Sequence, residues 1–213
     1  MLDVDSTLSG VEGIDHLAAL RSEAVRARVA EITDRAMRGE VALAEVYAER
    51  LAAVRPARAE VIELGREYVA RMEPGARESL ATLADAGVKI VLVSAGIRDA
   101  ILLLAREVGI SDSDVHAVDV YFRDNGDYAG FDSASPLTQN GGKATIVRGF
   151  GLPRPILAVG DGVTDAELKT LDPPAVDAFA AYTGVINRAS VVSVADYTIN
   201  SFERLLALIL ARE

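Results

Sequence analysis

Three short apolar segments of this chain are each followed closely by acidic or hydroxyl side chains, and this arrangement restricts the fold strongly. The segments are centred on Val4 and on residues 88–93 and 155–159. Helical patterns separate them, which favours a parallel sheet with right-handed crossovers. Ligands collect at the carboxyl ends of strands in such sheets. We therefore expect Asp3, Ser94 and Asp161, which lie at the predicted strand ends, to converge on one site.

A long helical insertion separates the first predicted strand from the second. Between residues 14 and 71 apolar side chains recur at steps of three and four, without the alternation of a strand. Gly39 and Pro56 interrupt the pattern, so we expect several helices. The insertion is too long for one crossover, which predicts a helical cap of residues 14–73 on a core of residues 1–13 and 74–213.

The remaining sequence continues the alternation of helices and strands. Residues 118–131 predict a β-hairpin with Asp124-Asn125-Gly126 as its turn. A last helix starts near Asn200, with Glu203 as a capping partner. Further helices are expected at 76–86, 98–108 and 143–150, and further strands at 176–181 and 197–199. The predicted fold class is α/β: a Rossmann-like three-layer parallel sheet with an inserted helical cap and a small β-hairpin flap.

Charge and composition exclude several kinds of partner. The 213 residues include 22 basic and 32 acidic side chains, a net charge of −10 that disfavours nucleic acid and anionic membranes. Cysteine is absent, so the simplest expectation is a reducing, cytoplasmic location. No apolar run is long enough for a membrane span, and no secretory signal is visible.

Asp3 and Asp5 lie two residues apart, which is the spacing of side chains on the same face of a strand. Side chains two residues apart on a strand point the same way. Two such acids can share a cation and divide a reaction, one as nucleophile and one as general acid and base. A simple surface turn is the alternative, because Asp and Ser favour turns.

A second acidic pair, Asp161 and Asp165, follows the strand at 155–159. Four residues apart at the start of a helix, these side chains share a face. Together with Asp3 they offer the hard oxygen ligands that Mg²⁺ prefers. An acidic helix N-terminus without any metal explains the same residues equally well.

Ser94 and Lys143 stand at two further predicted junctions between a strand or loop and a helix. The Ser94 hydroxyl and nearby N–H groups are suited to holding a phosphate, and an ordinary N-cap is the alternative. Lys143 follows two glycines at a helix start, where its charge would face an anion, although a surface lysine is the commoner case.

Taken in order, these pieces resemble the haloacid dehalogenase superfamily and, within it, the phosphoserine phosphatase family. The superfamily has four motifs: D-x-D-x-T, a Ser or Thr after a strand, a Lys, and G-D-x-x-x-D. The matching segments extend over nearly the whole chain: Asp3 to Thr7, Glu12 to Asp15, Arg35 to Met37, Glu49 to Leu51, Tyr128 to Asp132, Gly141 to Lys143 and the loop at Gly160.

This resemblance implies a complete catalytic site. Asp3 would attack phosphorus and become an aspartyl-phosphate, and Asp5 would protonate the leaving oxygen and then activate a water. Mg²⁺ would be bound by Asp3, the backbone carbonyl of Asp5, Asp161 and Asp165. Ser94 and Lys143 would hold the phosphate oxygens, in a loop that continues through Ala95 and Gly96.

The segments near and within the helical cap that match the family imply an amino-acid phosphate as substrate. Glu12 corresponds to the family's acid for the substrate ammonium and Arg50 to its arginine for the carboxylate, while Met37 and Thr164 line the pocket. The implied activity is Mg²⁺-dependent hydrolysis of O-phospho-L-serine in serine biosynthesis. Two residues depart from the family pattern: Ala95 replaces a glycine in the phosphate loop, and Arg38 replaces a glycine beside the substrate.

Other readings stay open at this point. The alternatives are transfer of the phosphoryl group to a small alcohol such as homoserine, or hydrolysis of another small phosphomonoester. A phospho-accepting receiver or silent binding module is disfavoured, because receivers lack the second acid of D-x-D and have no cap. We expect a small-molecule phosphomonoester as partner and a monomer or homodimer.

Overall fold

The computed structural model describes residues 1–37 and 43–211, and its centre is a parallel sheet. The paired strands are β1 (Leu92–Ile97), β2 (Val115–Val118), β5 (Leu157–Gly160), β6 (Ala178–Tyr182) and β7 (Tyr197–Ile199). The first segment of the chain joins the two halves, because Leu2 forms parallel bridges to both Leu92 and Val159. The order across the sheet is therefore β2, β1, the first segment, β5, β6 and β7.

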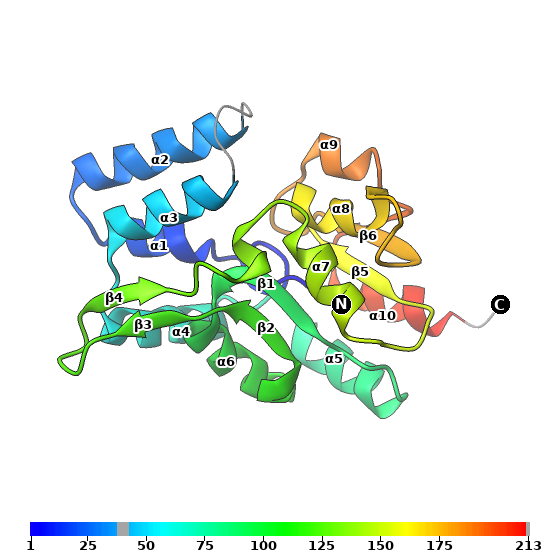
Figure 1. Cartoon of the computed structure of the whole chain (residues 1–213). Helices are drawn as coiled ribbons and strands as arrows, with labels where there is room; N and C mark the ends of the chain where they lie inside the picture. Colours follow the sequence, from blue (N-terminus) through cyan, green and yellow to red (C-terminus); the bar gives the residue numbers. More distant parts are fainter. Residues whose placement is uncertain (38–42, 212–213) are drawn as a thin grey trace.

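Helices cover both faces of this sheet. One layer contains α5 (Ala76–Asp85), α6 (Arg98–Glu107) and α10 (Phe202–Leu210); the other contains α7 (Gly142–Gly149), α8 (Val163–Thr170) and the short α9 (Ala189–Val192) (Figure 1). Aliphatic side chains fill the space between the layers, and Val4, Leu92 and Ala158 are fully buried there. The three-layer α/β architecture predicted from the sequence is confirmed.

The described residues of the predicted insertion form four helices. They are α1 (Gly13–Ala19), α2 (Glu23–Met37), α3 (Leu43–Val54) and α4 (Arg58–Ala70). Helices α1 to α3 pack on one another above the carboxyl end of β1, whereas α4 lies along the core helix α6 (Figure 1). The division at residues 13 and 74 stays a prediction, with α4 as the helix that links the two parts.

The hairpin flap forms where it is predicted. β3 (Val120–Phe122) pairs antiparallel with β4 (Tyr128–Phe131), and the turn contains Gly126 with a φ of 87°. Aromatic contacts tie the hairpin to the helical insertion: the Arg58 guanidinium lies 5.1 Å from the Phe122 ring centroid, and the rings of Tyr47 and Phe131 lie 5.3 Å apart. Two 3-10 helices, η1 (Asp112–Asp114) and η2 (Pro136–Thr138), complete the connections.

The second strand is displaced from its predicted position. The sequence predicts a strand over residues 88–93, but β1 runs from Leu92 to Ile97 and contains Ser94 instead of ending before it. A strand needs a hydrogen-bonded neighbour, and the first segment provides one only from Leu2 onward, through Leu2 N–H to the Val91 carbonyl at 2.9 Å. Beside residues 88–90 and 155–157 the sheet instead borders an apolar groove of about 560 Å³.

Other boundaries shift by one or two residues. The strands predicted at 155–159 and 176–181 are observed as β5 and β6, each starting two residues later. The last helix is capped by Ser201, whose hydroxyl accepts a hydrogen bond from Arg204 N at 3.3 Å, not by Asn200. Ser201 has the extended backbone that an N-cap needs, and the cap therefore lies one residue later than predicted.

Candidate active site

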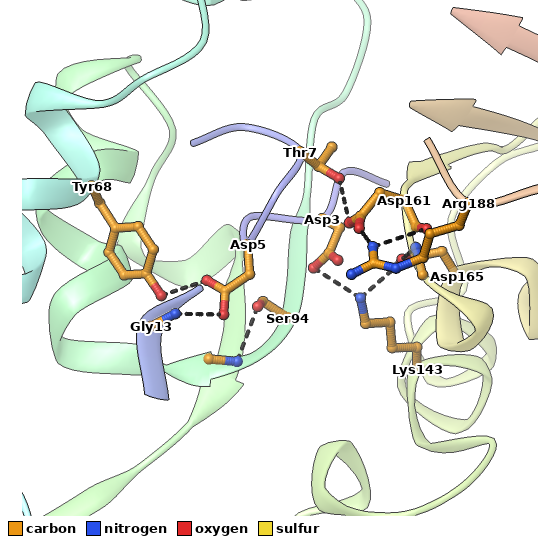
Figure 2. Close-up of polar contacts among 12 residues, drawn as sticks. Asp3, Asp5, Thr7, Gly13, Tyr68, Ser94, Lys143, Asp161, Asp165 and Arg188 are labelled. Carbon is orange, nitrogen blue, oxygen red and sulfur yellow. Dashed lines mark hydrogen bonds and ion pairs between the residues drawn. The ribbon is translucent and has the colours of Figure 1, made fainter. Parts of the chain in front are cut away.

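Asp3, Lys143 and Asp165 form a buried charge cluster at the carboxyl ends of the central strands. Lys143 Nζ lies 2.8 Å from Asp3 Oδ1 and 2.7 Å from Asp165 Oδ1 (Figure 2). Lys143 is the second residue of α7, as predicted, and its ammonium is buried. Burial alone would lower the pKa of Lys143, but the Asp165 and Asp3 carboxylates outweigh it and raise the pKa, so this cation stays charged.

The loop after β5 brings Asp161 and Asp165 to the same place. Gly160 permits this, because a Cβ there would lie 2.1 Å from Asp165 Cγ. Asp165 Oδ2 accepts a hydrogen bond from Gly162 N at 3.1 Å, and Asp161 Oδ1 accepts one from Thr7 Oγ1 at 3.1 Å. Asp161 itself precedes α8, so the two acids meet through the loop and not, as predicted, as neighbours on one helical turn.

Three carboxylates of this cluster fit a divalent cation. Asp3, Asp161 and Asp165 are all buried, and one oxygen from each lies within 4.8 Å of the other two. Asp3 Oδ1 is buried and accepts no well-directed hydrogen bond from any described residue. Burial first, and then the nearby Asp3 charge, raise the pKa of Asp165 to about 7, although the Lys143 charge opposes the rise. Hard oxygen donors of this kind suit Mg²⁺.

Asp5 lies beside this cluster but points away from it. Its Oδ1 accepts a hydrogen bond from Tyr68 Oη at 2.5 Å and its Oδ2 accepts one from Gly13 N at 3.1 Å (Figure 2). Gly13 permits the approach of Tyr68, because a Cβ there would lie 2.2 Å from the hydroxyl. Burial, followed by the nearby Glu12 charge, raises the pKa of Asp5 to about 7, so this carboxyl can carry a proton near neutral pH.

Glu12 meets two groups at the rim of the site. Its Oε1 accepts a hydrogen bond from Ser6 Oγ at 2.7 Å and lies 3.7 Å from Arg188 Nη2. Arg188 also forms an ion pair with Asp161 and donates to its backbone carbonyl at 3.4 Å. Ser6 holds a left-handed backbone with a φ of 52°, which turns the chain from the first segment toward Glu12.

The predicted phosphate loop lies at the end of β1. Ser94 is buried, and its Oγ accepts a hydrogen bond from Gly96 N at 3.0 Å. Its hydroxyl does not cap α6, whose N-cap is Ile97, so the N-cap alternative for Ser94 is wrong. Ala95 is only half-buried and belongs to the strand.

The remaining predicted site residues come from the insertion and from α8. Arg50 Nη2 pairs with Asp15 Oδ1 at 2.8 Å, while Arg50 Nε is buried and has no hydrogen-bond partner among the described residues. Thr164 is half-buried in the first turn of α8, next to Asp165. Met37 ends α2, but its side chain lies outside the described residues, as does all of Arg38.

Three site residues were not predicted. Arg188 follows β6 by six residues, so the rule about the carboxyl ends of strands offered a signal for it. Tyr68, on α4, and Tyr47, on α3, had no such signal, because a tyrosine at helical spacing is ordinarily part of the core. Tyr47 is 4% exposed, and its hydroxyl has no hydrogen-bond partner among the described residues.

Comparison with known proteins agrees with this geometry. The family model described as haloacid dehalogenase-like hydrolase matches residues 1–168. Phosphoserine phosphatase of Rattus norvegicus is 38% identical over 208 residues, which cover 96% of this chain and 89% of the relative. The chloroplastic phosphoserine phosphatase of Arabidopsis thaliana is 36% identical over 96% of this chain and 69% of its own length.

Solved structures show the same fold. A phosphoserine phosphohydrolase-like protein from Francisella tularensis superposes with a TM-score of 0.83, at 24% identity and 98% coverage of both chains. A substrate-bound phosphoserine phosphatase complex superposes with a TM-score of 0.73 at 22% identity, covering 98% of this chain and 95% of the other.

The chain therefore belongs to the haloacid dehalogenase-like hydrolase family. Among its members the relatives reported above are phosphoserine phosphatases, so both parts of the resemblance drawn from the sequence are confirmed. The family assignment makes the protein a phosphatase of the hydrolase class. Among the described residues no helix has the length and apolar character needed to cross a membrane.

Proposed function

We propose that this protein hydrolyses O-phospho-L-serine to L-serine and phosphate, as a step of serine biosynthesis. The observation that carries the proposal is the buried cluster of Asp3, Lys143, Asp161 and Asp165 with Asp5 beside it. The proposal is further supported by relatives that are 36–38% identical over 96% of the chain and bear the name phosphoserine phosphatase.

In the proposed reaction Asp3 is the nucleophile. Its carboxylate oxygen forms a bond to phosphorus while the bond between phosphorus and the serine oxygen breaks, which gives an aspartyl-phosphate. Asp5, whose pKa is about 7, gives a proton to the leaving alkoxide. The same carboxylate then removes a proton from a water that attacks phosphorus, which releases phosphate and restores Asp3.

Asp5 must turn for both steps. In the structure its oxygens are held by Tyr68 and Gly13, on the side away from Asp3 (Figure 2). Cap closure over a bound substrate would screen the acyl phosphate from other nucleophiles. Because Gly13 starts α1 and Tyr68 belongs to α4, movement of these helices would reach Asp5 directly.

The remaining site residues would bind the metal ion, the phosphate group and the amino-acid part of the substrate. Asp3, the backbone carbonyl of Asp5, Asp161 and Asp165 would hold Mg²⁺, which when bound neutralises charge between the nucleophile and the phosphate. Lys143, Ser94 and the backbone at Ala95 and Gly96 would hold the phosphate oxygens. Glu12 would bind the ammonium and Arg50 the carboxylate, with Thr164 and Met37 lining the pocket.

A substrate panel tests this proposal. Phosphate release with Mg²⁺ is measured for phosphoserine, phosphothreonine, phosphoethanolamine and sugar phosphates, with Asp3→Asn as the inactive control. We expect a clear preference for phosphoserine in kcat/KM and loss of turnover in the variant. Equal rates across the panel would remove phosphoserine as the substrate, and near-normal turnover by Asp3→Asn would remove the nucleophile.

Partners and location are part of the same proposal. We expect a small phosphomonoester as the only required partner, a cytoplasmic location and a monomer or homodimer. The absence of cysteine supports a reducing compartment, and the net charge of −10 argues against nucleic acid.

A further inference from the structure

Two polar groups on one face of α3 are buried without partners. The Tyr47 hydroxyl and Arg50 Nε each lack a hydrogen-bond partner among the described residues. Tyr47 is 4% exposed, so the orphaned hydroxyl cannot be satisfied by bulk water. Buried polar atoms are nearly always paired, because an unpaired one has lost its hydrogen bonds to water without gaining a replacement. A pair of orphans three residues apart on a helix therefore points to a ligand that both groups share.

Helix α1 connects this pair to the active site. Arg50 Nη2 donates to Asp15 Oδ1 of α1 at 2.8 Å, and the first residue of that helix, Gly13, donates through its N–H to Asp5 Oδ2 at 3.1 Å. In agreement with this geometry, burial first, and then the charge of Asp5, raise the pKa of Tyr47, whereas the Arg50 charge opposes the rise. The Tyr47 ring is fixed from its other side by Phe131 of the hairpin, with centroids 5.3 Å apart.

Both groups donate hydrogen bonds, and the arginine carries a positive charge. Nε of a guanidinium is a donor only, and a protonated phenol readily donates to an anion. Asp15 Oδ1 accepts a hydrogen bond from Arg50 Nη2 at 2.8 Å. One of the nitrogens with which an arginine usually binds a carboxylate is therefore already hydrogen-bonded without a ligand. A carboxylate, which has two oxygens, needs a second donor in this arrangement, and the unpartnered Tyr47 hydroxyl, three residues away on α3, is the candidate.

We propose that the Tyr47 hydroxyl, together with Arg50 Nε, binds the carboxylate of the amino-acid phosphate and so helps to determine substrate specificity. The inference rests on the proposed function, because it assumes a substrate with a carboxylate. Tyr47 touches neither the phosphate nor the nucleophile, so its contribution belongs to ground-state recognition and is expressed in KM more than in kcat.

Tyr47→Phe tests this inference with little disturbance, since it keeps the ring that packs on Phe131 and removes only the hydroxyl. Tyr182→Phe is the matched control: Tyr182 is also buried, but its hydroxyl already has a protein partner, Glu73, to which it donates at 2.6 Å. Both variants and the wild type are assayed with phosphoserine and with phosphoethanolamine, which lacks the carboxylate. Thermal melting verifies that each variant is folded.

We expect Tyr47→Phe to raise the KM for phosphoserine by roughly 10-fold, the loss of one hydrogen bond to a charged group, with kcat changed less than about twofold. The kcat/KM for phosphoethanolamine should be unchanged in both variants. If phosphoethanolamine is hydrolysed too slowly to measure, inhibition of p-nitrophenyl phosphate hydrolysis replaces it. L-serine is then the inhibitor with a carboxylate and ethanolamine the one without, and the ratio of their inhibition constants is compared between the variants.

Three outcomes would overturn the inference, in different ways. If the wild type prefers phosphoserine and Tyr47→Phe keeps that preference in full, Tyr47 does not bind the carboxylate, and the proposed function is unaffected. Equal losses with phosphoserine and phosphoethanolamine also exclude a contact to the carboxylate. A wild-type enzyme with no preference between the two substrates removes the proposed function, and with it this inference.

Discussion

Tyr68 Oη donates a 2.5 Å hydrogen bond to Asp5 Oδ1, although 63 residues separate the two in the sequence. Tyr68 is fully buried on α4, the helix that lies along α6 of the core. The contact therefore connects the acid proposed for proton transfer with α4, a helix of the insertion that packs along the core helix α6. Tyr68 acts through Asp5, so it is a positioning residue.

The first prediction concerns this positioning. Tyr68→Phe removes one of the two donors that orient Asp5 and leaves Gly13 N as the other. Because the Tyr68 hydrogen bond lowers the pKa of Asp5, its loss should raise that pKa and move the pH profile of kcat for phosphoserine to higher pH, while KM stays within about twofold. Steady-state kinetics between about pH 5 and pH 9 measure the profile, with Tyr182→Phe as the control, and an unshifted profile in Tyr68→Phe would contradict the prediction.

The second prediction concerns Arg188, which pairs with Asp161 of the three-carboxylate cluster. A divalent cation must compete with this guanidinium for the same carboxylate. Removing the arginine should therefore strengthen metal binding, by about fivefold if the partly exposed pair is worth about 1 kcal/mol. We expect Arg188→Met to lower the Mg²⁺ concentration that gives half-maximal activation.

The control for this variant is Arg154→Met, which breaks a similar ion pair with Asp177 on an exposed part of the surface. It should leave the Mg²⁺ requirement unchanged. Weaker Mg²⁺ activation in Arg188→Met would mean that the guanidinium supports the metal site instead of competing for it.

The sequence predicted the charged centre of the site because strand ends are visible as a change from apolar to polar residues. Asp3, Lys143, Asp161 and Asp165 all follow such changes, and the structure brings them together. The parallel sheet was predictable for the same reason. The start of β1 was not, because it depends on the register of β1 against the neighbouring segment, in which Leu92 lies beside Leu2, and no local pattern encodes that register.

The helical part of the site was harder to predict for a physical reason. Tyr47 and Tyr68 occupy core positions of amphipathic helices, and only the tertiary structure shows that their hydroxyls reach the site. Arg50 was found through resemblance, whereas its pairing with Asp15 was not foreseen. Side chains that act from the insertion depend on how the helices pack, which spacing alone does not determine.

The third prediction concerns metal binding and stability. Asp3, Asp161 and Asp165 carry three negative charges, and Lys143 and Arg188 balance only two of them, so Mg²⁺ should bind the folded chain and stabilise it. At a free concentration 100 times its Kd the ion should add about 2.7 kcal/mol to the free energy of unfolding, and EDTA should remove this gain. Denaturant unfolding with and without Mg²⁺ measures it.

Asp161→Asn should abolish most of this Mg²⁺-dependent gain, since it removes one of the three carboxylates. Asp177→Asn, a change at an exposed carboxylate, should keep the wild-type response. An equal gain in Asp161→Asn and the wild type would show that the ion stabilises the protein somewhere other than at the cluster.

The fourth prediction concerns the ion pair that fastens the turn after α1 to the start of α4. Both oxygens of Glu60 accept hydrogen bonds from Arg21, at 2.6 and 2.5 Å, and Arg21 Nε also donates to the Val54 carbonyl at 2.8 Å. The hydrogen bonds from Arg21 lower the pKa of Glu60 below its usual value of 4.5. A lowered pKa in the folded state means that the contribution to stability is fully present above pH 4.5 and is lost as the pH falls through the folded value.

Glu60→Gln should therefore reduce the free energy of unfolding by about 0.5–1 kcal/mol at pH 7, the range for a largely solvated pair with good geometry. The difference from wild type should shrink as the pH falls below 4.5, because protonated Glu60 no longer differs in charge from glutamine. Urea unfolding between pH 3 and pH 7 measures this, with Glu63→Gln as the control, since Glu63 pairs with Arg66 alone among the described residues, on an exposed helix face. A Glu60→Gln penalty that stays constant over this range would assign the effect to the α4 cap, where Glu60 accepts from Ala57 N at 2.8 Å, and not to charge.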